Sequence, residues 1–528
     1  MVDSLPGMNV VLNDLGLKVA PPPAGPKLTL LGVTSNTSIT LREPYTIASV
    51  EKAMNALYFD LSGTSFPGGI AGVTGRVPGE LALAIEEASS AGASNIEVMV
   101  IGYYSGSSLQ NYLRADTDPT GRYIDLSGAY DVLRNRDIDF VVPVGAYMDT
   151  PFTGSAVSSY SFAKQLADFC YQATKESSAA HGVIGVRNPI EWAAFHRTGL
   201  VTASTTLSGE MISLFGTAGT GAFNSDALLL RQSQAVNFST PSSTLTDAWY
   251  TYHIGSYGQI YNSTYTAWLT GACDQNGNKL ENTSDSAAQS VNAGYFPYWQ
   301  AKNSDGTAAT DSRGGKIDAG GFISVFTAPV KAVGTLVRPL ALSLGSSPAL
   351  NSRNTQGAAA YAGKALSLAP QSGTTNKPID GLAPARLLSA RQATNLTALR
   401  HVSMYSRTRG LVVTAGNTGA HNVSKYIRSD YVNLTTMRVV SAVVDLIRAV
   451  GDKYIGEANN APQRNALESE ISQVLLSMKS QGALNSYDFS ISSTPDQAVL
   501  GIIDINLTLV PAFEIRTINL TVSLSKEL

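Results

Sequence analysis

Apolar residues in the last third of the chain recur at helical spacing in two stretches. The first, 430–450, predicts a helix with Asp430 as its N-cap. Its apolar residues share one face: Leu434, Met437, Val440, Val444 and Ile447. The second stretch, 461–484, predicts another helix, because Pro462 suits a first turn and Gly482 suits a stop. Its apolar stripe consists of Leu467, Ile471, Val474, Leu475 and Met478.

Strict alternation of apolar and polar residues follows these two helices. Residues 487–492 predict one strand, and 502–515 predict a second, which Pro511 separates from a third run. The apolar positions of that third run are Ile518, Leu520, Val522 and Leu524. An unpaired strand risks aggregation unless pairing with another subunit is its role. We therefore predict that 518–524 is an arm that adds a strand to a neighbouring subunit.

The stretch 28–201 alternates strand and helix patterns. Buried strands are predicted at 28–33, 95–104, 138–144 and 183–187, and amphipathic helices at 80–93 and 161–182. The short connections between them favour a sheet flanked by helices. Ser, Thr, Gly and Asn then dominate 202–345, where helical periodicity fades and a β-rich surface insertion is expected.

Prolines mark the N-terminal end of the sequence. Val10, Val11 and Leu12 predict a short strand, and the prolines within 21–26 favour an extended spacer after it. A tethered arm is the interpretation that fits this pattern. A terminus without fixed structure is the alternative.

The predicted fold class is α/β, in an α+β multi-domain arrangement with extended arms at both ends. The predicted segments are an N-terminal arm (1–27), an α/β domain (28–201) with 320–345 as a candidate to rejoin it, a β-rich exposed insertion (202–345), a linker (346–383), a C-terminal α/β domain (384–514) and a C-terminal strand arm (515–528).

Composition bounds the function classes. The 528 residues are 44% hydrophobic and 15% charged with a net charge of −3, which gives no global basis for nucleic-acid binding. No run approaches the roughly 18 apolar residues of a membrane span, and residues 1–19 lack a signal-peptide pattern. We therefore expect a soluble cytosolic product without membrane insertion. Cys170 and Cys273 have no metal-ligand spacing and are interpreted as free thiols.

Motifs for catalysis or metal binding are missing from the sequence. The five histidines form no HExxH or His/Cys cluster, no Walker motif or GxSxG elbow occurs, and 273–281 lacks the EF-hand spacing. GTAGTG at 216–221 lacks the βαβ context of a dinucleotide site. We therefore expect no catalytic residues, no metal and no cofactor, and a non-enzymatic role.

A charge asymmetry lies between Arg386 and Lys453. Ten basic residues stand there against three acidic ones, a local balance of +7 in a chain of −3. The functional interpretation is a docking face for an acidic partner, and a solvated face with internal salt bridges is the alternative. The candidate docking residues are Lys425, Arg428, Arg438, Arg448 and Lys453. No aromatic interleaving accompanies the charges, so direct nucleic-acid binding is not expected.

Four sequence pieces follow one another in a familiar order. They are NLTALRHVSMYSRTRGLVVTAGNT (395–418), the helix of 430–450, SQGALNSYDF (480–489) and DINLTLVPAFEIRTINLTVSL (504–524). This order resembles that of contractile tail sheath proteins of bacteriophages and related injection machines. The residues that fit the family's pattern in the first piece are Asn395, Arg400, Arg409, Gly410, Val413 and Gly416. Asn417 departs from it, because an arginine is usual there. LPGMNVVLNDLG (5–16) is similar to the family's N-terminal arm.

The resemblance implies a mechanical role. Subunits of that family stack as hexameric rings into a helical sheath around a tail tube, with the C-terminal domain facing the tube. Their arms add strands to neighbouring subunits, which here implies roles for Val10–Leu12 and 518–524, and the basic candidates would face the tube. The implied partners are further copies of the chain, a tail tube protein, and baseplate and tail terminator proteins.

Contraction of such a sheath would drive the tube through a host envelope for genome delivery. The implied location is the tail of a virion that is assembled in the host cytoplasm. A sheath subunit of a cellular contractile injection system would share every feature above and is the first alternative. An α/β enzyme with an unfamiliar motif and a receptor-binding surface protein, suggested by the Tyr-rich stretch 249–268, are the others.

Overall fold

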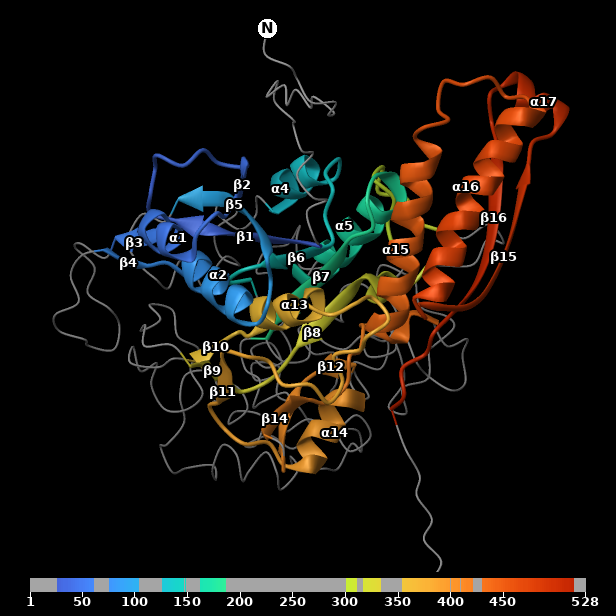
Figure 1. The fold of residues 1–528 in the computed structure, drawn as a ribbon. Helices are drawn as coiled ribbons and strands as arrows, with labels where there is room; N and C mark the ends of the chain where they lie inside the picture. The colour runs from blue at the N-terminus through green and yellow to red at the C-terminus, as the bar shows by residue number, and fades with distance from the viewer. Residues whose placement is uncertain are drawn as a thin grey trace, which may run out of the picture.

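A mixed sheet forms the centre of the molecule (Figure 1). The computed structural model describes residues 26–60, 76–103, 126–146, 148, 162–186, 301–310, 317–333, 354–398, 400–408, 410–420 and 430–516. Within these residues the sheet has seven strands, of which six are parallel and one edge strand, β2, is antiparallel. In spatial order they are β12 (His401–Val402), β8 (Ile323–Phe326), β7 (His181–Gly185), β6 (Phe140–Pro143), β1 (Lys27–Thr34), β5 (Asn95–Tyr103) and β2 (Pro44–Thr46). The predicted α/β class is confirmed.

Helices cover both faces of this sheet. One face is packed by α2 (Glu80–Ser90) and α13 (Ala358–Leu366), and the other by α4 (Leu126–Leu133) and α5 (Phe162–Glu176) (Figure 1). Because both faces are buried, the parallel strands read as nearly continuous apolar runs and seven of the eight residues of β1 are buried. Tyr130 of α4 stacks on Phe169 of α5 with ring centroids 4.4 Å apart.

The sheet crosses the domain boundaries that the sequence suggested. β8 comes from the 320–345 stretch and pairs with β7, whereas β12 comes from the predicted C-terminal domain and pairs with β8. The loop 301–310, predicted as part of an exposed insertion, packs on α5, because the backbone N–H of Lys302 donates to Asp168 Oδ1 at 3.1 Å. Ala301 and Ala309 are fully buried there. The 320–345 stretch thus rejoins the sheet through β8, as the sequence suggested. The places of β12 and of 301–310 differ from the predicted ones, because strand partners and packing surfaces far apart in sequence decide them.

The predicted linker 346–383 contains a core helix. In α13, eight of the nine residues are buried, against the sheet and α2. Gly363 lets the two helices approach closely, since a Cβ there would lie 2.5 Å from the carbonyl oxygen of Ala88. The prediction failed because the segment consists mainly of small residues, which form a tight helix contact without a conventional apolar stripe.

Shorter elements surround this core. They are α1 (Val50–Ala56), β3 (Tyr58–Asp60), β4 (Arg76–Pro78), the 3₁₀ turn η3 (Ala319–Phe322), β9 (Val330–Ala332), β10 (Asn354–Thr355), β11 (Leu382–Pro384), α14 (Ala390–Ala398), β13 (Met404–Arg407), β14 (Gly410–Val413) and the 3₁₀ turn η4 (Asp430–Val432). β3 pairs with β4, β13 pairs with β14, and β9 lies between β10 and β11.

The C-terminal residues form an elongated unit beside the sheet (Figure 1). It contains α15 (Leu434–Gly451), α16 (Ala461–Ser480), β15 (Leu484–Ser492), α17 (Pro495–Val499) and β16 (Asp504–Pro511), and it has its own apolar cluster. We call this the ribbon unit. The predicted stripe of α16 is confirmed, with Leu467, Ile471, Leu475 and Met478 buried and Val474 packed beside them. Pro462 lies in the first turn, as predicted, and Gly482 follows the last turn at φ +74°.

The predicted face of α15 was displaced by about one residue. Val439, Val443 and Val450 face α16 in the apolar cluster, whereas Val440 and Val444 are half-buried. Leu434, at the start of α15, packs instead into the core of the sheet. The helix therefore packs into two apolar clusters, whereas a single periodic stripe predicts packing into one. Its N-cap is Asn433 rather than Asp430.

Candidate assembly surface

The strands β15 and β16 form a two-stranded antiparallel ribbon. Tyr487 lies opposite Leu509, and the register continues to Ser492 opposite Asp504. Alternation places the apolar residues of both strands on one face, toward α15 and α16: Tyr487, Phe489, Ile491, Ile505, Leu507 and Leu509. Each of these six side chains is only half-buried. The helices therefore cover the apolar face incompletely.

The opposite face of the ribbon is polar and exposed. Its cross-strand pairs are Asp488 with Thr508, Ser490 with Asn506, and Ser492 with Asp504. At the far end, Thr494 and Gln497 form a capping box that closes α17 between the two strands. None of the residues of α17 is buried. The ribbon thus projects with one polar face, one incompletely covered apolar face and an exposed tip.

Both outer edges of the ribbon are open within the part of the chain that the structure describes. β15 and β16 pair with each other and with no other described strand. An edge strand presents a row of backbone N–H and C=O groups that can pair with an added strand. An arm from another chain can therefore extend this sheet by backbone hydrogen bonds, with side-chain alternation setting the register.

The predicted arms and two of the basic candidates lie outside the described residues. These are Val10, Val11, Leu12, Ile518, Leu520, Val522, Leu524, Lys425 and Arg428. The structure does not place them near the ribbon or away from it. Arg438, Arg448 and Lys453 are described, and each has a partner within the chain.

Arg438 is a buried side chain, which corrects its assignment to a partner-facing surface. It is 9% exposed, and its guanidinium donates to the carbonyl oxygens of Leu368 at 2.7 Å and Ala369 at 3.2 Å. Burial lowers the pKa of Arg438 to about 10, and interactions with Tyr361 and Asp139 oppose that shift. These hydrogen bonds fix α15 to the segment that follows α13.

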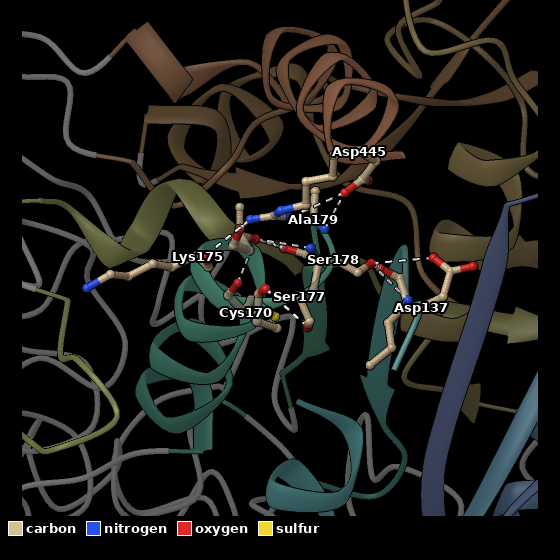
Figure 2. A network of polar contacts seen from close by, with 12 residues as sticks. Asp137, Cys170, Lys175, Ser177, Ser178, Ala179 and Asp445 are labelled. Carbon is tan, nitrogen blue, oxygen red and sulfur yellow. Dashed lines mark hydrogen bonds and ion pairs between the residues drawn. The ribbon is translucent and has the colours of Figure 1, made fainter. Parts of the chain in front are cut away.

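Arg448 and Asp445 join α15 to the end of α5 (Figure 2). Arg448 donates to the carbonyl oxygens of Thr174 and Lys175, which are the unpaired carbonyls at a helix C-terminus, where a cation is favourable. Asp445 accepts from the backbone N–H of Ala179 at 2.9 Å and lies 3.6 Å from Arg448. We call these contacts the α15 latch.

The pKa of Asp445 is raised to about 6, mainly by burial, and the Asp139 and Asp137 carboxylates contribute in the same direction. The hydrogen bond from Ala179 and the charge of Arg448 oppose this shift. The sequence could not reveal the latch, because its partners on α5 and before β7 are backbone groups rather than side chains. Figure 2 shows Asp445 directed at Ala179, with Ser178 and Asp137 on the far side of the same turn.

Lys453 is the most exposed of the described candidates. Its side chain is 63% exposed and donates to Glu470 Oε2 at 2.9 Å, next to the hydroxyl of Tyr454 on the other carboxylate oxygen. Among the described candidates for the docking face, Lys453 is therefore the one that is largely exposed, and it forms an ion pair with Glu470 between α15 and α16. Internal salt bridges and hydrogen bonds, the alternative interpretation of the basic stretch, hold all three described candidates.

Other kinds of site are absent from the described residues. They contain no helix long and apolar enough to cross a bilayer, and no group of three or more His, Cys, Asp or Glu side chains arranged around a possible metal. Cys170 is a buried free thiol. His181 is buried between strands, where its Nε2 lies 2.9 Å from Ser324 Oγ and burial lowers its pKa to about 3. This histidine is a core residue.

Neither the protein-family models nor the curated proteins gave a match. The chain is similar to a baseplate structure of the anti-feeding prophage, with 12% identity over 99% of this chain and 100% of that chain and a TM-score of 0.47. It is similar to the sheath complex of an extracellular contractile injection system, PVC, in the contracted state, with 13% identity, coverage of 100% and 99%, and a TM-score of 0.44.

It is also similar to a sheath tail protein from Listeria innocua, with 9% identity, coverage of 93% and 96%, and a TM-score of 0.42. The structures that the chain is similar to are thus a baseplate, a contracted sheath complex and a sheath tail protein.

Proposed function

We propose that this chain is the subunit of a contractile sheath, a structural and non-enzymatic protein that polymerises with copies of itself around a tube. The observation that carries the proposal is the β15–β16 ribbon, whose two outer edges are open in the described chain. A polymer subunit needs bonding groups that its own fold leaves unused. The ribbon has them on both sides, in backbone and in apolar side chains.

The strands that fill these edges are, in this proposal, the arms of neighbouring copies. The alternating residues 518–524 follow the ribbon by a few positions, and Val10–Leu12 precede a proline-rich spacer that gives reach. Each arm supplies one strand to the ribbon of another copy. Backbone pairing then gives affinity that does not depend on a buried side-chain interface, so subunits can reorient while the strands stay paired.

The finer form of the proposal follows from the sequence resemblance. The subunits form stacked hexameric rings in a helical sheath, on a baseplate and below a terminator, in the tail of a bacteriophage that delivers a genome. Lys453, with Lys425 and Arg428, remains the proposed contact to an acidic tube surface. A cellular injection system is the alternative, and particles purified with a tagged subunit decide between them: DNA-filled capsids on the tails support the phage form.

The test of the assembly role is imaging of the purified chain by electron microscopy. We expect hollow tubes from the full chain, and a folded chain that forms no tubes after deletion of 517–528, because that deletion removes the arm and spares every described residue. A circular dichroism melt equal to that of the full chain is the control for folding. Tubes of normal length from the truncated chain contradict the arm assignment, and the absence of tubes from the full chain contradicts the sheath proposal.

A further inference from the structure

In the segment that follows β16, the apolar side chains are exposed and a charged side chain is buried. In 512–516, the apolar residues Phe513 and Ile515 are 64% and 80% exposed, whereas the charged side chain of Glu514 is only 9% exposed. The backbone N–H of Ala512 donates to the carbonyl oxygen of Ala483 at 2.9 Å. A surface segment normally turns charges to water and apolar groups inward. Here the charged side chains hold the segment against the protein.

Glu514 lies against the loop that follows α13. A Cβ at Gly373 would come within 2.2 Å of Glu514 Oε1, so only glycine leaves room for the carboxylate at this place. Glu514 Oε2 is buried without a hydrogen-bond donor and lies 3.6 Å from Arg516 Nε. The ion pair is therefore the partner of that oxygen, and loss of Arg516 leaves the buried Glu514 carboxylate without it.

Arg516 reaches from this pair into the core. Its guanidinium donates to Asn417 Oδ1 at 3.2 Å and points to the carbonyl oxygen of Gly416 at 3.5 Å. The Gly416–Asn417 turn is bonded to the rest of the fold on three sides. Thr375 accepts from the N–H of Gly416, the carbonyl oxygen of Gly416 accepts from Leu434, and that of Asn417 accepts from Ser324 in β8.

We propose that Glu514 and Arg516 form a clamp, here called the tail clamp, that fixes the root of the C-terminal arm to the α/β core. The arm's role rests on the function proposed above. A pull on residues beyond Arg516 then reaches β8 and α15 through the Gly416–Asn417 turn before it reaches β16. Without the clamp the same pull acts directly on Pro511, the end from which β16 peels away from β15 one pair at a time.

The clamp thus separates two tasks within one stretch of chain. The ribbon remains intact as a template for incoming strands, while its own downstream arm carries tension to a neighbouring copy. Phe513 and Ile515 are turned outward by the same contacts. The clamp is ionic and only partly buried, so high salt weakens it and leaves the apolar core of the sheet unaffected.

The test uses the unassembled full chain, held by its two termini in an optical trap. In wild type, we expect the first extension step to release 484–516, roughly 11 nm at about 3.4 Å per residue. We expect Arg516→Ala to bring this step to a clearly lower force, and the amide of Ala512 to exchange with deuterium about tenfold faster. Gly373→Ala should act in the same way, because its Cβ displaces the Glu514 carboxylate.

Two matched variants serve as controls. Lys364→Ala removes an ion pair of 3.2 Å with Asp380 that shares no residue with the clamp, and Gly451→Ala adds a Cβ with nothing within 4 Å. Both should leave the step and the exchange rate unchanged. Unchanged force and exchange in Arg516→Ala and in Gly373→Ala overturn the clamp. These readouts need no polymer, so a wild-type chain that forms no tubes refutes the sheath proposal and leaves the clamp result standing.

Discussion

The parallel sheet and the β15–β16 ribbon are both made of strands, but their side chains are buried to different degrees. In the sheet, inner strands have a strand on each side and helices on both faces, and Leu28, Leu30 and Phe326 are fully buried. In the ribbon, each strand has one partner and the apolar face is half-covered. The difference indicates that the sheet supplies stability, while the ribbon leaves backbone groups and apolar surface unpaired in the described chain, as the proposed function requires.

The largest effect is expected in the sheet. Phe326→Ala removes a fully buried ring that stacks on Tyr361 at 5.4 Å, and should lower the free energy of unfolding by about 3–5 kcal/mol. Urea denaturation measures this loss in the free energy of unfolding. Phe489→Ala in the ribbon is the matched change and should cost less than half as much, because that ring is half-buried. Equal losses for the two variants would break the comparison.

A second variant examines whether the ribbon unit opens on its own. Ile471→Ala empties a fully buried position in α16 and should cost about 2–4 kcal/mol. Hydrogen exchange should accelerate in α16 and β15 and stay unchanged in β1 and β5, since the apolar cluster of the unit is separate from that of the sheet. Faster exchange in both regions would mean that the two cores unfold together.

The α15 latch makes the junction between the two regions sensitive to pH. The pKa of Asp445 is raised to about 6, so the folded chain holds a proton that the unfolded chain releases above pH 3.8. The contribution of Asp445 to the free energy of unfolding is fully present below pH 3.8 and is lost as pH rises through about 6. The free energy of unfolding of wild type relative to that of Asp445→Asn should therefore increase as pH falls from 7 to 4. Urea denaturation at each pH measures this difference. A difference that is constant with pH contradicts the shift.

The smallest effect is expected at the surface of the ribbon unit. Lys453→Ala breaks an exposed ion pair with Glu470 and should leave the melting temperature unchanged within error, because exposed pairs gain little over hydration. Arg438→Ala, on the same helix, should lower the melting temperature clearly, since it removes a buried side chain and its two hydrogen bonds to the carbonyl oxygens of Leu368 and Ala369. A large loss from Lys453→Ala would show that this pair belongs to the junction.

Sequence patterns predicted the inner strands β1, β5, β6 and β7 and most of the ribbon unit, but not β12 at the edge of the sheet, for a physical reason. The stripe of α16 and the alternation of β16 are set by neighbours within a few residues, so periodicity alone identifies them. β12 has two residues and becomes a strand only because β8 lies beside it. No local pattern encodes such a partner.

The same reason explains the errors at single residues. Arg438 was assigned to a surface by its charge, but its partners are backbone carbonyls some 70 positions earlier in the chain. The sequence did not predict the contacts of Glu514 and Arg516, because Glu514 lies against a loop glycine and Arg516 donates to a buried asparagine. Residues whose partners are main-chain groups of distant segments lie beyond what composition and spacing can predict.

The position of β8 beside β7 has a consequence for how the chain is made. When a ribosome has completed β7, the strand that will cover its open edge has not been synthesised, because Gly182 pairs with Ile323. At 5–20 residues per second the delay is on the order of ten seconds. During that time a buried-type apolar edge is uncovered in the nascent chain, which makes it a binding site for chaperones. A slow-translating host should therefore yield less correctly folded protein unless its chaperones are abundant.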